Sequence, residues 1–132
     1  MAIILDADVI IRGEKGKFDL INWCEAQSAE IEIAAITIAE LWHGVERATG
    51  VLRREREQYL QELVTSLPII PYTEETAYEH ARIWAELSAS GKMISLYDLI
   101  VAATALEHGS EVATFNKKHF SAVAGLKIIE PK

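Results

Sequence analysis

Cysteine is nearly absent from this chain, which has only Cys24 among its 132 residues. A single cysteine cannot form an internal disulfide, and disulfides are rare in reducing compartments, so we expect a cytoplasmic protein. The N-terminus lacks the basic and apolar segments of a secretory signal, so no signal peptide is expected. No apolar run approaches the roughly 20 residues that span a bilayer, and no membrane segment is expected.

Basic residues are in the minority: 13 Lys and Arg stand against 20 Asp and Glu, and the net charge is −7. This balance argues against a protein that binds nucleic acid through nonspecific positive charge. It does not exclude an enzyme whose carboxylates surround metal ions, because the metal inverts the local charge. Half of the residues are hydrophobic and a quarter are charged, as in globular proteins. We expect residues 1–132 to form a single domain.

Several catalytic motifs are also missing. The sequence has no Gly-x-Ser-x-Gly turn, which argues against a Ser-His-Asp hydrolase. It has neither the Gly-x-x-x-x-Gly-Lys-Ser/Thr loop nor the Gly-x-Gly-x-x-Gly turn that bind nucleotide phosphates. The four histidines are scattered, and no Cys or His pair has the spacing of a zinc site.

Apolar runs and amphipathic stretches alternate along the chain. They predict strands at 2–5, 30–36, 68–72, 111–115 and 127–131. They predict helices at 18–27, 37–48, 52–67, 73–90 and 95–109. The segment after the first strand is expected to be a loop through Gly13 and Gly16, and Trp42 and Trp84 are interpreted as core residues. The pattern predicts an α/β fold with a central, mostly parallel sheet of four or five strands flanked by helices, in which 68–72 is an edge strand.

Acidic side chains follow the predicted strands. Asp6 and Asp8 come directly after the first strand, in "AIILDADVII". Glu40 and Asp98 lie in the first turns of two helices, and Asn116 follows the strand at 111–115. If the backbone is still extended at Asp6, the side chains of Asp6 and Asp8 point to the same side. Ligands of such sheets bind at the carboxyl ends of the strands, where all these residues are expected.

Helix capping is the alternative explanation for some of these acids. Thr37 with Glu40, and Ser95 with Asp98, both fit the capping-box pattern. The two roles are compatible, since a capping carboxylate still has a second oxygen. Acidic residues occur at more of the expected sheet-to-helix junctions than helix capping alone would explain. They favour a hard divalent cation such as Mg²⁺, which activates water and stabilises the charge on a cleaved phosphodiester.

Four segments carry a resemblance to a known family: "ILDADVII", "TIAELWHGVERA", "GKMISLYDLIVAATALEHG" and "VATFNKKHF". They occur in the order seen in PIN-domain ribonucleases, and the whole chain resembles the VapC-type toxins of bacterial toxin–antitoxin pairs. The resemblance implies a PIN domain in which Asp6, Glu40 and Asp98 hold Mg²⁺ or Mn²⁺ for RNA hydrolysis. Asn116 completes the catalytic set where many relatives have a fourth Asp. Because Asn offers an oxygen but no charge, a second metal ion would be held weakly.

Other residues receive supporting roles under this resemblance. Asp8 and Thr114 are expected to orient Asp6 rather than to bind the metal, although direct ligation by Asp8 stays open. His119 is interpreted as structural. Four cations are candidates for contacts with RNA phosphates: Arg47, Arg82, Lys117 and Lys118.

The resemblance also implies partners. These are an RNA substrate, a VapB-type antitoxin that presents a basic residue to the acidic pocket, and a second copy of the chain in a homodimer.

Two alternatives remain at this level. "IILDADVI" also resembles the start of haloacid-dehalogenase-type phosphatases, in which Asp6 would be a covalent nucleophile. The late strand lacks the Asp pair that such enzymes need, and Glu40 would have no role. The second alternative is a PIN-like domain that binds RNA or a partner without cutting, which Asn116 and the acidic charge favour.

Overall fold

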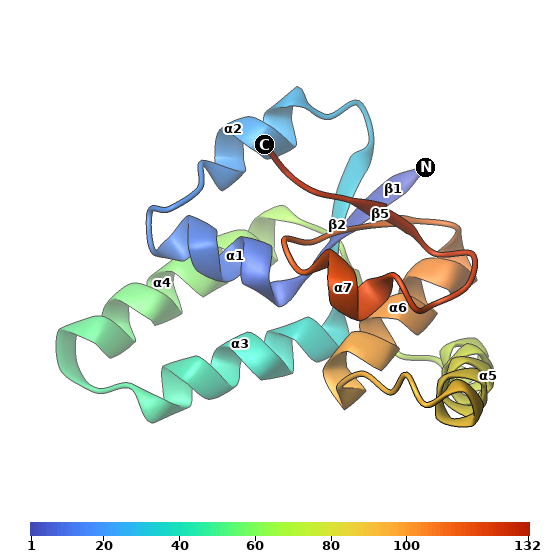
Figure 1. Cartoon of the computed structure of the whole chain (residues 1–132). Helices are drawn as coiled ribbons and strands as arrows, with labels where there is room; N and C mark the ends of the chain where they lie inside the picture. Colours follow the sequence, from blue (N-terminus) through green and yellow to red (C-terminus); the bar gives the residue numbers. More distant parts are fainter.

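The computed structural model describes all residues from 1 to 132. Five strands form one parallel sheet in the order β3-β2-β1-β4-β5 (Figure 1). The strands are β1 (Ala2–Leu5), β2 (Glu30–Ala34), β3 (Ile69–Ile70), β4 (Glu111–Ala113) and β5 (Lys127–Ile129). The helices are α1 (Ala7–Glu14), α2 (Leu20–Ala26), α3 (Ala35–Arg47), α4 (Gly50–Ser66), α5 (Glu74–Ser90), α6 (Leu96–His108) and α7 (Lys117–Phe120). The predicted parallel α/β sheet is confirmed, and β3 is an edge strand as expected.

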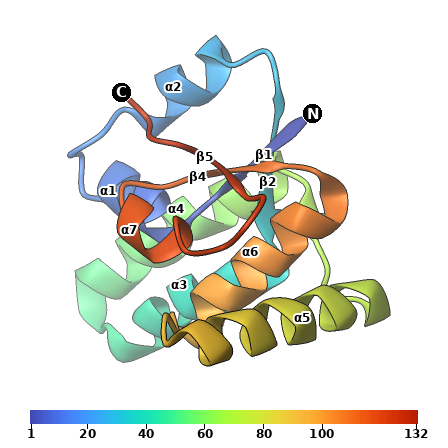
Figure 2. The ribbon, with the colours of Figure 1, turned by 45° about the vertical axis from the view of Figure 1, so that its right-hand side comes forward.

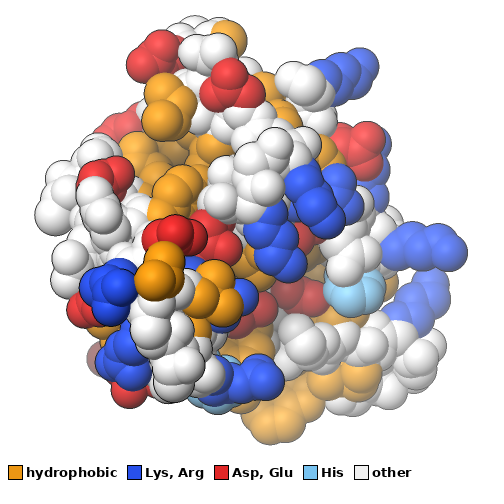
Figure 3. Space-filling model, turned by 90° about the vertical axis from the view of Figure 1, so that its left-hand side faces the viewer, with side chains coloured by type: hydrophobic (Ala, Val, Ile, Leu, Met, Phe, Trp, Pro, Cys, Tyr) orange, Lys and Arg blue, Asp and Glu red, His pale blue; other side chains and the backbone are white.

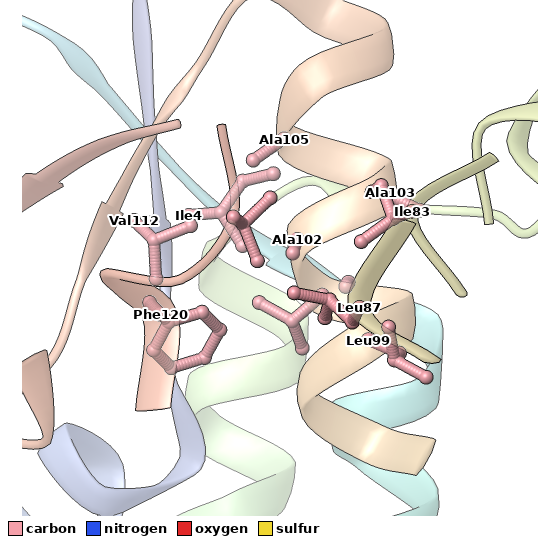
Figure 4. Packing of buried hydrophobic residues seen from close by; sticks show 12 residues of the cluster. Ile4, Ile83, Leu87, Leu99, Ala102, Ala103, Ala105, Val112 and Phe120 are labelled. Carbon is pink, nitrogen blue, oxygen red and sulfur yellow. The ribbon is translucent and has the colours of Figure 1, made fainter. Parts of the chain in front are cut away.

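Helices cover both faces of the sheet, with α5 and α6 on one side and α1, α2 and α4 on the other (Figures 1 and 2). The side chains of the central strand β1 point alternately to the two faces of the sheet, so β1 contributes to the hydrophobic core on each face. Ile4 packs against α5 and α6 with Phe120 (Figure 4), whereas Ile3 and Leu5 pack on the opposite face. On the α6 side, the small residues 102, 103 and 105 are fully buried alanines, which lets this helix lie close to the sheet. No helix is long and apolar enough to cross a membrane.

The segment after β1 is helix α1, so the predicted loop through Gly13 and Gly16 is wrong. Asp6 begins the helix as its N-cap, and its Oδ1 accepts a hydrogen bond from the Ala7 backbone N–H at 2.8 Å. Gly13 lies inside α1, where a Cβ atom would come within 2.6 Å of the Tyr59 hydroxyl oxygen. Gly16 follows the helix with φ 71°, in the left-handed region that favours glycine.

The two predicted capping boxes have different outcomes. Helix α3 begins at Ala35 and its N-cap is Ala34, without a side-chain cap, so the Thr37–Glu40 box is wrong. Helix α6 is capped by Ser95, whose Oγ accepts from the Asp98 N–H at 3.2 Å. The Asp98 carboxylate does not complete that box, because it contacts His119 instead.

The apolar stripe expected on α5 contains Ala77, His80 or Ala81, Trp84 and Leu87, and of these only Leu87 is fully buried. Thr76, Ile83 and Leu87 are the buried residues of the helix. The Trp84 side chain is 53% exposed, so its interpretation as a core residue is wrong. Trp84 stacks on His80 at the surface, with ring centroids 5.8 Å apart. Trp42 is half-buried.

Candidate active site

Asp6 and Thr114 meet because β1 and β4 are neighbours in the sheet. Leu5 pairs with Ala113, so the next residue of each strand emerges at the same carboxyl edge. The Asp6 N–H donates to the Ala113 carbonyl at 2.9 Å. The Thr114 hydroxyl donates to Asp6 Oδ2 at 2.8 Å, and both residues are buried. The Asp6 carboxylate is thereby fixed at the edge of the sheet.

Asp8 reaches the same place by a different route from the one expected. It lies in the first turn of α1, so the assumption of extended backbone from Asp6 to Asp8 is wrong. Its carboxylate nevertheless turns back to β4, where Oδ2 accepts from the Phe115 N–H at 3.2 Å. The Thr114 hydroxyl lies 3.5 Å from both Asp8 oxygens. The end of β4 therefore holds both acids.

Burial raises the pKa of three carboxyl groups of the site. Burial and then the charges of Asp8 and Asp98 together raise the pKa of Asp6 to about 7, although the hydrogen bonds from the Thr114 hydroxyl and the Ala7 N–H act in the opposite direction. Burial also raises the pKa of Asp8. The pKa of Glu40 is raised by burial and then by the charges of Asp98 and Asp8. Asp6, Asp8 and Asp98 lie at the starts of α1 and α6 and Glu40 lies in the second turn of α3 rather than the expected first turn, and their charges act on one another.

His119, interpreted from the sequence as structural, lies at this site. Its Nδ1 lies 3.1 Å from Asp98 Oδ2 and 2.8 Å from the Asn116 side-chain nitrogen. Asn116 is in turn held by its backbone N–H, which donates to Thr114 Oγ1 at 2.9 Å. A protonated Nδ1 donates to Asp98, and an unprotonated Nδ1 accepts from the Asn116 side chain, so the tautomer of His119 decides which of the two contacts is a hydrogen bond.

The four predicted phosphate-binding cations lie in different places. Lys117 and Lys118 are exposed on α7, directly after Asn116. Arg47 is exposed in the last turn of α3 and has no contact with the acids. Arg82 bonds to two carboxylates of its own helix, Glu79 at 2.7 Å and Glu86 at 3.0 Å.

Sequence reasoning missed Arg12. Its guanidinium carbon lies 4.2 Å from the centre of the Phe115 ring, and its charge lowers the pKa of Asp8. The signal was the spacing of four residues from Asp8 to Arg12, which places both on one helix face. That signal has meaning only if α1 is expected to be a helix.

The donor set suits a hard divalent cation. No group of three or more His, Cys, Asp or Glu residues is close enough in this structure to enclose an ion. Mg²⁺ does not need such a cage, because it keeps several waters and uses one or two carboxylates with substrate phosphates. The available ligands are carboxylate oxygens, and a cation among them would relieve the repulsion that raises the pKa of Asp6. These oxygen donors are of the kind that hard divalent cations prefer.

Comparison with known proteins identifies the family. The model of the PIN domain matches residues 3–126. Ribonuclease VapC1 of Rickettsia felis is 33% identical over 98% of this chain and 96% of its own length. VapBC-5, a toxin–antitoxin system of Mycobacterium tuberculosis, has a chain that superposes with a TM-score of 0.79 at 27% identity, covering 98% of this chain and 99% of that one. A chain of VapBC2 from Rickettsia felis, solved with a DNA fragment, has the same fold, with a TM-score of 0.90 at 23% identity over 100% of both chains. This protein therefore belongs to the PIN-domain family and, within it, to the VapC-type ribonucleases.

Proposed function

We propose that this protein is a metal-dependent endoribonuclease and the toxin of a type II toxin–antitoxin pair. The observation that carries the proposal is the position of Asp98, which lies close enough to Asp6 and to Glu40 for its charge to raise the pKa of both, although the three residues come from distant parts of the chain. Carboxylates that repel one another gain most from a shared cation. Membership in a ribonuclease family then favours RNA as the polymer that is cut.

Each residue has a defined task in this proposal. Asp6, Glu40 and Asp98 hold Mg²⁺ or Mn²⁺, which when bound supplies an activated water and neutralises charge on the scissile phosphate. Thr114 and Asp8 hold Asp6 in place. Water attacks the phosphorus, the bond from phosphorus to the 3′ oxygen breaks, and the two products carry a 3′-hydroxyl and a 5′-phosphate. Asn116 contributes an oxygen without a charge, and the exposed Lys117 and Lys118 approach the RNA backbone.

The partners follow the same proposal. We infer a VapB-type antitoxin whose basic side chain would occupy the acidic pocket and replace the charge of the metal, because the related VapBC-5 is a toxin–antitoxin system. We further propose that the protein forms a homodimer, that residues 1–132 form a single PIN domain, and that the protein is located in the cytoplasm.

The phosphatase alternative has less support than it had from the sequence. The family model that matches residues 3–126 is that of the PIN domain. Glu40, which is coupled to the other acids, would have no task.

A single set of assays separates the candidates. Purified, antitoxin-free protein is incubated with total RNA and with p-nitrophenyl phosphate, in Mg²⁺, in Mn²⁺ and in EDTA. Metal-dependent RNA cleavage supports the endoribonuclease. Phosphate release without RNA cleavage would support the phosphatase. Neither activity in folded protein would support the non-cutting PIN-like domain.

A further inference from the structure

A pocket of about 320 Å³ lies beside the acids and was not assigned by sequence reasoning. Asp8, Ile11, Arg12, Lys15 and Lys17 line it. Three of these five side chains are basic, although acids outnumber bases in the whole chain. None of the three takes part in an ion pair within the structure. Their positive charge is therefore available to a ligand.

The backbone fixes these cations relative to the acids. Asp8, Arg12 and Lys15 are spaced by four and three residues, so they lie along one face of α1 at intervals of about 5–6 Å. The chain then turns back: the Lys17 N–H donates to the Arg12 carbonyl at 2.9 Å, and the Gly16 N–H donates to the Gly13 carbonyl at 3.2 Å. This pair of bonds is a Schellman motif, which returns Lys17 to the end of the helix.

Arg12 has a second constraint. Its guanidinium lies over the Phe115 ring at 4.2 Å, and the edge of Phe18 meets that ring with centroids 5.3 Å apart. The backbone N–H of Phe115 is the group that holds Asp8. The ring thus positions Arg12 next to the carboxylates and leaves the planar guanidinium donors free for an anion.

Stabilisation of the helix dipole is the simpler explanation. Cations near the last turn of a helix contribute about 0.3–1 kcal/mol each. This accounts for the place of Arg12 and Lys15 along α1. It does not account for the contact of Arg12 with Phe115, nor for Lys17, which lies beyond the helix but lines the same pocket.

We propose that Arg12, Lys15 and Lys17 bind the backbone phosphates of the RNA strand next to the bond that is cut. The inference rests on the proposed function and extends it. An acidic site in a chain of net charge −7 repels RNA, so the strand needs local cations to approach it. Figure 3 shows acidic side chains set back in a hollow whose border carries Lys and Arg side chains. RNA passing over the acids would meet the pocket along α1.

The test compares two double variants that each remove two positive charges. Lys15→Ala/Lys17→Ala changes the pocket. Lys127→Ala/Lys132→Ala is the matched control, since Lys127 begins β5 at the amino edge of the sheet, opposite the acids, and Lys132 is the exposed C-terminal residue. The substrate is a mixed-sequence single-stranded RNA that carries a fluorophore and a quencher. The values of kcat and KM are measured over a range of KCl concentrations, and circular dichroism checks the fold.

The pocket variant should lose roughly tenfold in kcat/KM, mainly through KM, with a salt dependence shallower by about 1.4, since each single-strand phosphate contact contributes about 0.7 to the log–log slope. The control should change less than about twofold and keep the slope. Arg12→Lys keeps the charge but loses the planar guanidinium, so KM should rise while the slope stays. Arg12→Ala removes both the charge and the guanidinium, so KM should rise and the salt dependence should become shallower.

Equal behaviour of the two double variants, with wild-type cleavage intact, would overturn the inference. Unchanged RNA kinetics with weaker binding of an antitoxin would also overturn it and would assign the pocket to a protein partner. If the wild type cleaves no RNA while folded and antitoxin-free, the proposed function fails first, and the inference falls with it.

Discussion

The Thr114 hydroxyl donates to Asp6 Oδ2 at 2.8 Å, across 108 positions of sequence. The same oxygen accepts from the Asn116 N–H at 2.9 Å and lies 3.5 Å from the Asp8 carboxylate. One hydroxyl therefore connects three members of the site. Its donated bond is also the largest influence that lowers the pKa of Asp6.

Replacing Thr114 by Val removes this hydroxyl while keeping the volume. The variant should lose about 1–3 kcal/mol of unfolding free energy, because a buried carboxylate and a backbone N–H lose their partner. The acid limb of the cleavage pH profile should move to higher pH, since the pKa of Asp6 rises further. Thr114→Ser keeps the donor and should restore the profile. An unshifted acid limb in Thr114→Val, at equal metal affinity, would show that Thr114 does not act on Asp6.

The raised pKa of Asp6 predicts a pH-dependent stability of the metal-free protein. The carboxyl ionises near pH 3.8 in the unfolded chain but only near about 7 in the folded one. Below pH 3.8 the Asp6 carboxyl is protonated in both the folded and the unfolded state. As pH rises through it, the unfolded state gains stability by ionising, so the free energy of unfolding falls.

Asp6→Asn should remove most of this fall and should be more stable than the wild type at pH 8 in EDTA, by on the order of 1 kcal/mol. Urea unfolding at pH 4 and pH 8 measures the difference. Asp8 and Glu40 also have raised pKa values, so a smaller slope should remain in the variant. A variant less stable than the wild type at pH 8 would contradict the repulsion on which the proposed metal site depends.

Gly13 of α1 faces the Tyr59 hydroxyl of α4. Gly13→Ala would place a Cβ atom 2.6 Å from the Tyr59 hydroxyl oxygen and 3.0 Å from Leu20 Cβ, so it should destabilise the protein by about 1–3 kcal/mol. Tyr59→Phe removes the oxygen and should recover part of this loss in the double variant. A double-mutant cycle by thermal unfolding gives the coupling energy. Additive effects would mean that α1 does not pack against Tyr59 in this way.

His119 is predicted to orient Asp98. His119→Ala should lower kcat by about 10- to 100-fold, the usual effect of removing a partner that holds a metal-binding carboxylate. His108→Ala is the matched control, since His108 is exposed at the far end of α6. His119→Asn, which can still donate to Asp98, should recover part of the activity. Wild-type kcat in His119→Ala would show that the contact has no catalytic consequence.

The sequence predicted the strands because these depend on short-range patterns of apolar residues. The short, Ile-rich run before Asp6 favours a buried strand, and a parallel sheet gathers residues such as Asp6 and Asn116 at one edge. The hydrogen bonds of Thr114 could not be predicted in this way. They require β1 and β4 to be neighbours, and nothing in the pattern of either strand specifies that order.

The missed features have local physical reasons. Two glycines made the α1 region look like a loop, yet Gly13 is required by a contact with Tyr59, which lies far along the chain. Without α1, the alignment of Asp8 with Arg12 could not be seen. On α5, Leu87 is buried as expected, but Ile83 is buried in place of Trp84; one residue rotates a helix face by about 100°, so Trp84 lies at the surface.

The most direct test of the account is cleavage of a labelled structured RNA by the wild type and by Asp6→Asn, each in Mg²⁺, in Mn²⁺ and in EDTA. The account predicts cleavage by the wild type only when metal is present. It predicts none by Asp6→Asn, although that variant stays folded and is at least as stable without metal. Cleavage by folded Asp6→Asn at the wild-type rate, or cleavage by the wild type in EDTA, would contradict the assignment of the acidic site.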